Sequence, residues 1–146
     1  MSLHWLSRRD RSVPIPEVAY VEESDFGGWY ARPEPAYPNG CIVVSADWLQ
    51  NPEDEPAALA HEWQHHVQLF SGRISQDRRE ARAAHRILGA LRSGALTYEQ
   101  AMGRYFRIPS EREAALETVR RLPGHELSRY WLSLSGLYVS PLGILA

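Results

Sequence analysis

Short apolar runs separated by turn residues characterise the first third of the chain. Residues 18–21, 29–32 and 41–45 are rich in β-branched or aromatic side chains, and glycine, proline or asparagine stands between them. Such side chains fit the pleated surface of a sheet, whereas glycine and proline favour turns. We therefore predict about three strands in a small antiparallel or mixed sheet, connected as a meander. Residues 1–12 are predicted to form a short helix packed on the body or a loose arm.

From residue 50 onward, apolar positions recur every three or four residues, which is the period of an α-helix. Leu59, Trp63, Val67 and Phe70 form one such stripe on a helix predicted over residues 53–70, with Gly72 as its stop. Further helices are predicted over residues 77–92, 97–104, 109–122 and 125–134, followed by an apolar tail over 136–146. A small N-terminal sheet followed by a helical C-terminal half indicates an α+β fold.

The length of the chain sets its domain count. It has 146 residues, 44% of them hydrophobic and 23% charged, which is enough for one domain with a core and too few for two. We predict a single domain over residues 1–146. No apolar run is long enough to cross a bilayer, and the first nine residues lack the order of a signal peptide, because their basic residues follow the apolar ones. These features predict a cytoplasmic protein with no membrane partner.

Cysteine content and charge restrict the chemistry further. Cys41 is the single cysteine, so an internal disulfide and a cysteine-based zinc framework are both excluded. The net charge of −2 is uneven: residues 1–72 carry 4 arginines and 11 acids, and residues 73–146 carry 12 arginines and 7 acids. The basic second half makes a nucleic-acid-associated protein a rival interpretation. The negative total and the scarcity of interleaved aromatic and basic residues argue against it.

His61, Glu62 and His65 form the sequence His-Glu-x-x-His on the helix predicted over residues 53–70. Residues four apart lie above one another on a helix, so both imidazoles can reach one Zn²⁺ at about 2.0–2.1 Å. Glu62 would lie beside the metal, where a carboxylate can take a proton from a bound water and pass it to a leaving amine. The apolar stripe occupies another face, so we predict that the motif faces a cleft. His66 lies about 100° from His65 around the helix, which places it behind the ligands or against the core.

Two histidines do not complete a catalytic zinc site, which uses three protein ligands and leaves a position for water. Gln68 and Ser71 stand where a metzincin has glycine and a third histidine, so that arrangement is excluded. The remaining candidates for the third ligand are Glu80, His85, Glu111, Glu113 and His125. Glu111 and Glu113 point about 200° apart on an ideal helix, so only one of these two can face the metal.

The motif together with a later glutamate resembles the gluzincins, the thermolysin-like division of zinc metallopeptidases. Residues 105–114, Tyr-Phe-Arg-Ile-Pro-Ser-Glu-Arg-Glu-Ala, are similar to a segment of small bacterial and phage proteins classed as metallopeptidases, and the run from His65 to Gln68 matches the His-x-x-Gln ending common among them. The resemblance covers roughly residues 41–120. It implies a zincin-like fold with zinc held by His61, His65 and Glu111. Glu80, which also stands in a Glu-x-x-Ala context, remains the alternative ligand.

The resemblance implies a hydrolase that cleaves peptide bonds, with Zn²⁺ as cofactor, Glu62 as general base and acid, and a peptide or protein as substrate. The strand over residues 41–45 would lie above the cleft, and an extended substrate would pair with it by strand addition. The alternative is a catalytically silent zinc-binding protein with a regulatory or interaction role. Candidates for the residue that steadies the oxyanion are Tyr105, His125, Tyr130 and Tyr138.

Overall fold

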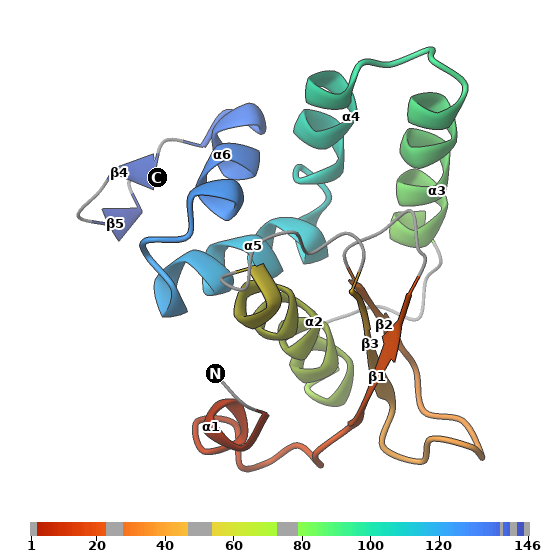
Figure 1. Ribbon diagram of the computed structural model, residues 1–146, viewed down its shortest axis with the longest axis vertical. Helices are drawn as coiled ribbons and strands as arrows, with labels where there is room; N and C mark the ends of the chain where they lie inside the picture. The colour runs from red at the N-terminus through yellow and green to blue at the C-terminus, as the bar shows by residue number, and fades with distance from the viewer. Residues whose placement is uncertain are drawn as a thin grey trace. The chain divides into compact units, whose positions relative to one another are not determined.

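The computed structural model describes residues 3–22, 28–46, 54–72, 79–137, 139–140 and 143–144. The chain forms two compact units, Met1–Arg73 and Ile74–Ala146. The first contains a three-stranded sheet and the helix with the His-Glu-x-x-His motif, and the described part of the second is mainly helical (Figure 1). The predicted α+β content is confirmed. The single domain over residues 1–146 stays a prediction.

The strands β1 (Glu17–Val21), β2 (Gly28–Ala31) and β3 (Cys41–Ser45) form one sheet in the order β1-β3-β2. β3 pairs with β1 in parallel and with β2 in antiparallel orientation. The sheet is therefore mixed, and the predicted meander is wrong. All of β3 is buried, whereas β1 and β2 contain no fully buried residue. A strand buried on both faces is suited to the centre of a sheet, which accounts for the observed order.

The central place of β3 also corrects the expectation that residues 41–45 bind an extended substrate. Every residue of β3 has a partner on β1, and all but Ser45 also have a partner on β2. Strand addition needs an edge whose backbone groups are unpaired. Among the described strands of this sheet, only β1 and β2 are edge strands, so an added strand would have to pair with one of them.

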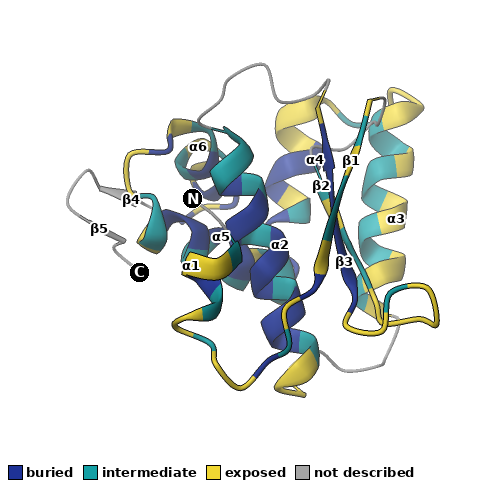
Figure 2. Ribbon diagram, turned by 60° about the horizontal axis from the view of Figure 1, so that its bottom comes forward, coloured by how far each residue is buried: buried dark blue, intermediate teal, exposed yellow. Residues whose placement is uncertain are grey.

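α2 (Asp54–Phe70) packs against this sheet and carries the motif. Leu59, Trp63 and Val67 are buried as predicted, in one cluster with Ile42 and Val44 of β3. Figure 2 shows this buried band along α2 and β3 in dark blue. The prediction for the end of the stripe, Phe70, is wrong, because its side chain is 42% exposed. It is the last residue of the helix, so no following turn covers it.

The N-terminal segment is fastened to α2. Of the two predicted alternatives for residues 1–12, a short helix on the body is confirmed: α1 (Leu3–Ser7) buries Leu6 in the core cluster of this unit, and Val13 joins the same cluster. The indole Nε1 of Trp63 donates a hydrogen bond to Asp10 Oδ2 at 2.8 Å. The imidazole Nε2 of His66 donates to the carbonyl oxygen of Pro14. Two consecutive turns of α2 are therefore tied to this segment.

The second unit contains the helices α3 (Arg79–Arg92), α4 (Tyr98–Tyr105), α5 (Pro109–Arg121) and α6 (Glu126–Leu134). They correspond to the four helices predicted there, although residues 77 and 78 of the first lie outside the described residues. Thr97 and Gln100 form a reciprocal capping box at the start of α4. His125 caps α6, because its Nδ1 accepts a hydrogen bond from the backbone N–H of Ser128. These local signals explain why the helix starts were predictable.

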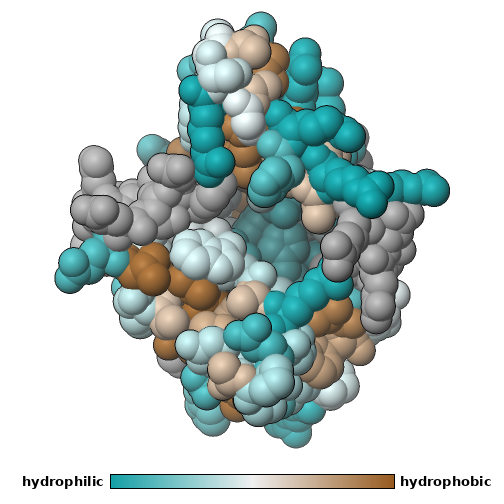
Figure 3. Space-filling view, turned by 90° about the vertical axis from the view of Figure 1, so that its right-hand side faces the viewer, coloured by the Kyte–Doolittle hydropathy of each residue, from teal (hydrophilic) through white to brown (hydrophobic). Residues whose placement is uncertain are grey.

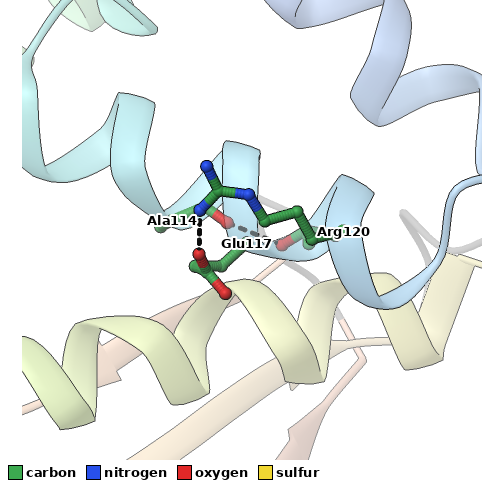
Figure 4. Close-up of polar contacts among 4 residues, drawn as sticks. Ala114, Glu117 and Arg120 are labelled. Carbon is green, nitrogen blue, oxygen red and sulfur yellow. Dashed lines mark hydrogen bonds and ion pairs between the residues drawn. The ribbon is translucent and has the colours of Figure 1, made fainter. Parts of the chain in front are cut away.

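α5 shows how the second unit separates its buried and exposed faces. Ala115 and Val119 belong to the core cluster of this unit, and Ala114 is fully buried. Thr118 is also buried and satisfies its hydroxyl by donating to the carbonyl oxygen of Ala114 at 2.8 Å. Figure 4 shows this bond together with the ion pair between Glu117 and Arg120. The ion pair is partly exposed, so it contributes little to stability.

Two short strands, β4 (Val139–Ser140) and β5 (Gly143–Ile144), form an antiparallel pair. The remainder of the tail predicted beyond residue 137 lies outside the described residues. None of the described helices combines the length and apolarity that a membrane span requires. Hydrophilic and hydrophobic side chains are intermixed on the face drawn in Figure 3.

Candidate metal centre

The two histidines of the motif point at one another from successive turns of α2. Their Nε2 atoms are 3.2 Å apart, and the ring centroids are 4.9 Å apart in an edge-to-face arrangement. Both side chains are half-buried. Two imidazole nitrogens bound to one tetrahedral zinc at about 2.0–2.1 Å would lie roughly 3.3 Å apart. The spacing of the two Nε2 atoms thus already matches a shared metal.

One group of three possible metal ligands occurs among the residues that the structure describes: His61, His65 and Glu111. Each offers one ligand atom, and these atoms lie within 4.8 Å of one another. Glu111 stands in the first turn of α5 and is half-buried. These are the three residues that the sequence predicted as ligands, and such a group could hold a metal ion.

The chemistry of the three donors narrows the choice of metal. Imidazole suits zinc, copper, iron and nickel, and a carboxylate can complete such a site. Two histidines and one glutamate are a ligand set of catalytic zinc sites, which keep a further position open for water. The donor set and the nitrogen spacing both fit Zn²⁺.

Glu62 follows His61 on α2 and lies against the edge strand β2. Its side chain is 7% exposed. A Cβ atom placed on Gly28, the first residue of β2, would lie 3.6 Å from Glu62 Cγ and 3.8 Å from Glu62 Oε1. The same atom would lie 2.9 Å from the carbonyl oxygen of Val43. The absence of a side chain at Gly28 therefore lets β2 approach β3, and it leaves this position at ordinary contact distance from Glu62, a neighbourhood that the sequence did not reveal.

The other candidate ligands have different places in the structure, and none of them belongs to the three-residue group. Glu80 accepts a hydrogen bond from the hydroxyl of Ser110. His85 is exposed on α3. His125 is buried and uses its Nδ1 in capping α6. Glu113 stands two residues after Glu111 on α5, on a different side of the helix.

The candidates for an oxyanion-stabilising residue stay predictions, and their surroundings differ. Tyr130 is 43% exposed. His125 is the N-cap of α6 and accepts a hydrogen bond from the backbone N–H of Ser128. Tyr105 is half-buried, with its ring packed edge-on against Phe106 at a centroid distance of 5.1 Å. Tyr138 lies outside the described residues.

His66 packs against the core, which is one of its two predicted places, and forms the buried back of the helix. Its side chain is fully buried against the rings of Trp63 and Phe70. Since Nε2 donates to the carbonyl of Pro14, the neutral ring has Nδ1 as its acceptor, and the Tyr30 hydroxyl donates to it at 2.9 Å. Burial lowers the pKa of His66 and raises the pKa of Tyr30 to about 12, so both groups are neutral near pH 7.

Cys41 has no catalytic surroundings. It is 1% exposed in the central strand. Burial, followed by the nearby charge of Glu17, raises the pKa of its thiol. A reactive cysteine needs the opposite shift, so these surroundings favour a buried strand residue over a nucleophile.

Replacing Gly28 with alanine is expected to lower the free energy of unfolding by about 1–3 kcal/mol, the usual cost of overpacking. The added methyl group would press against the Val43 carbonyl oxygen at 2.9 Å, so β2 must shift away from β3. Urea denaturation measures the change. Gly89→Ala on α3 is a matched control, because nothing lies within 4 Å of its Cβ position, and helical alanine should be more stable by about 0.5–1 kcal/mol. Equal stability of Gly28→Ala and the parent chain would contradict the close approach.

Comparison of the chain with known protein families, with curated proteins and with solved structures finds no match.

Proposed function

We propose that this chain is a zinc-dependent peptidase of the gluzincin type, with a zincin-like arrangement of sheet and active helix. The observation that carries the proposal is the grouping of His61, His65 and Glu111 with their ligand atoms within 4.8 Å. The buried carboxylate of Glu62, one residue from His61, supplies the additional group that hydrolysis needs.

The residues of the centre have separate tasks in this proposal. His61, His65 and Glu111 would hold the zinc. Zinc, when bound, supplies Lewis acidity that polarises a carbonyl and lowers the pKa of a water towards about 7. Glu62 accepts a proton from the attacking water and returns it to the nitrogen of the leaving amine. Its burial against β2 keeps competing solvent away from that carboxylate.

An extended peptide is the substrate class that fits the surroundings of Glu62. β2 is an edge strand, and its first residue lies alongside the Glu62 carboxylate. A peptide added to the open edge of β2 would place its backbone next to this carboxylate. We therefore assign substrate pairing to β2, in place of the central strand β3.

Metal analysis and a cleavage assay test the proposal together. Protein purified without chelator should contain one zinc per chain, because a single three-ligand group is present among the described residues. It should cleave members of a mixed peptide library, lose this activity with a chelator, and regain it when zinc is restored. A chain that lacks stoichiometric metal would refute the metal centre. Stoichiometric zinc without any cleavage would instead identify a catalytically silent zinc-binding protein.

A further inference from the structure

Gln68 is a buried polar residue that the proposed reaction does not use. It stands one turn after His65 on α2 and is 1% exposed. Its Oε1 atom lies 2.9 Å from Nδ1 of His65. An amide oxygen can only accept a hydrogen bond, so Nδ1 of His65 carries the proton and donates it. The pairing is local, because residues three apart are neighbours on a helix surface.

This hydrogen bond decides which nitrogen of His65 can bind a metal. A neutral imidazole has one N–H and one lone pair. With the proton on Nδ1, the lone pair belongs to Nε2, which is the atom that lies 3.2 Å from His61 Nε2. The bond to Gln68 also limits rotation of the ring, because turning the ring would break it. Gln68 therefore aims the lone pair of His65 at the shared position.

The chemical nature of the group that accepts the Nδ1–H of His65 also affects metal binding. Histidine ligands of metals usually donate their second N–H to a carboxylate, a carbonyl or a water, and loss of that partner typically lowers metal affinity about 10–100-fold. Here the partner is a neutral amide. It supplies the acceptor without placing a negative charge against the His65 ring. At 1% exposure, Gln68 is hidden from bulk solvent.

We propose that Gln68 is a positioning residue of the metal centre, which holds His65 in the tautomer with its proton on Nδ1 and its Nε2 directed at the metal. The inference rests on the proposed function in one respect, the identity of the metal as zinc. The tautomer itself is a property of the metal-free chain and can be measured on its own.

The first experiment measures the His65 tautomer without metal. The ¹⁵N chemical shifts of the ring nitrogens distinguish a protonated Nδ1 from a protonated Nε2. The metal-free parent chain should show the proton of His65 on Nδ1, and Gln68→Met, which keeps the length of the side chain but lacks the acceptor, should lose this preference. Ser71→Ala is a matched control, because the Ser71 hydroxyl contacts the backbone carbonyl of Gln68 and not its amide. A proton on Nε2 in the parent chain would overturn the inference, whatever the zinc content.

The second experiment measures zinc affinity by competition with a chelating dye. Gln68→Met should bind zinc about 10–100-fold more weakly, whereas Gln68→Glu, whose carboxylate can still accept the Nδ1–H, should bind at least as tightly as the parent chain. Circular dichroism and thermal unfolding identify a variant that fails to fold. If Gln68→Met does not fold, weaker zinc binding by Gln68→Glu than by the parent chain would overturn the inference. Equal zinc affinity of a folded Gln68→Met and the parent chain would overturn it. A parent chain that binds no zinc would refute the proposed function, while the tautomer measurement would still stand.

Discussion

Replacing Glu62 with glutamine is expected to preserve zinc binding and to lower kcat/KM for peptide cleavage by about 10²–10⁴-fold, the usual contribution of a general acid–base group. Glutamine has nearly the same shape, so it should occupy the buried place against β2 without repacking. It cannot accept the proton of the attacking water. Zinc content by atomic absorption and cleavage of the best library peptide measure the two halves of the expectation.

Glu55→Gln provides the matched control for this variant. Glu55 lies on the same helix, and its carboxylate accepts a hydrogen bond from the Tyr20 hydroxyl at 2.7 Å. It belongs to no metal-ligand group that the structure describes, so its removal should leave cleavage unchanged. Full activity in Glu62→Gln would eliminate Glu62 as the general base. Loss of zinc in Glu62→Gln would instead show that this carboxylate helps to hold the metal.

Replacing either His61 or Glu111 with alanine should abolish stoichiometric zinc binding. Each change removes one of the three proposed ligands. The loss in zinc affinity should therefore exceed the roughly 10–100-fold loss expected when a ligand keeps its place but loses its hydrogen-bond partner. Competition with a chelating dye measures the affinity, and peptide cleavage should fall with it. This test is most informative for Glu111, because its assignment began from a resemblance.

Two alanine variants serve as controls for Glu111. Glu113→Ala lies on the same helix about 200° away, and Glu80→Ala removes the carboxylate that accepts from Ser110. Both should keep zinc affinity close to that of the parent chain. If Glu111→Ala keeps its zinc while Glu80→Ala loses it, the third ligand is Glu80.

The parts of this molecule that were predictable depend on neighbouring residues. The strand at residues 41–45 was predictable because β-branched residues adjoin one another there, and the helix starts at Thr97 and Pro109 carry local capping or proline signals. The pairing of His61 with His65 follows from the helical repeat itself. Glu111 could be selected only through its resemblance to a family segment, because spacing left several carboxylates and histidines open.

The features that sequence reasoning missed depend on contacts between distant parts of the chain. The strand order β1-β3-β2 depends on which strands pair with one another. A meander of the same three strands would have the same pattern of residues along each strand, so that pattern does not distinguish the two orders. The approach of Gly28 to Glu62 joins positions that no helical or strand period relates. Likewise, the bonds of Trp63 to Asp10 and of His66 to Pro14 span 53 and 52 residues.

These last two bonds make α2 a preorganised part of the centre. Trp63 follows Glu62 and His66 follows His65, so each functional residue has a neighbour, about 100° further round the helix, that is anchored in the N-terminal segment. The anchors resist rotation of the helix about its axis. The cost of fixing the helix on which both imidazoles stand is consequently met during folding rather than when an ion arrives, so more of the intrinsic ligand strength appears as affinity.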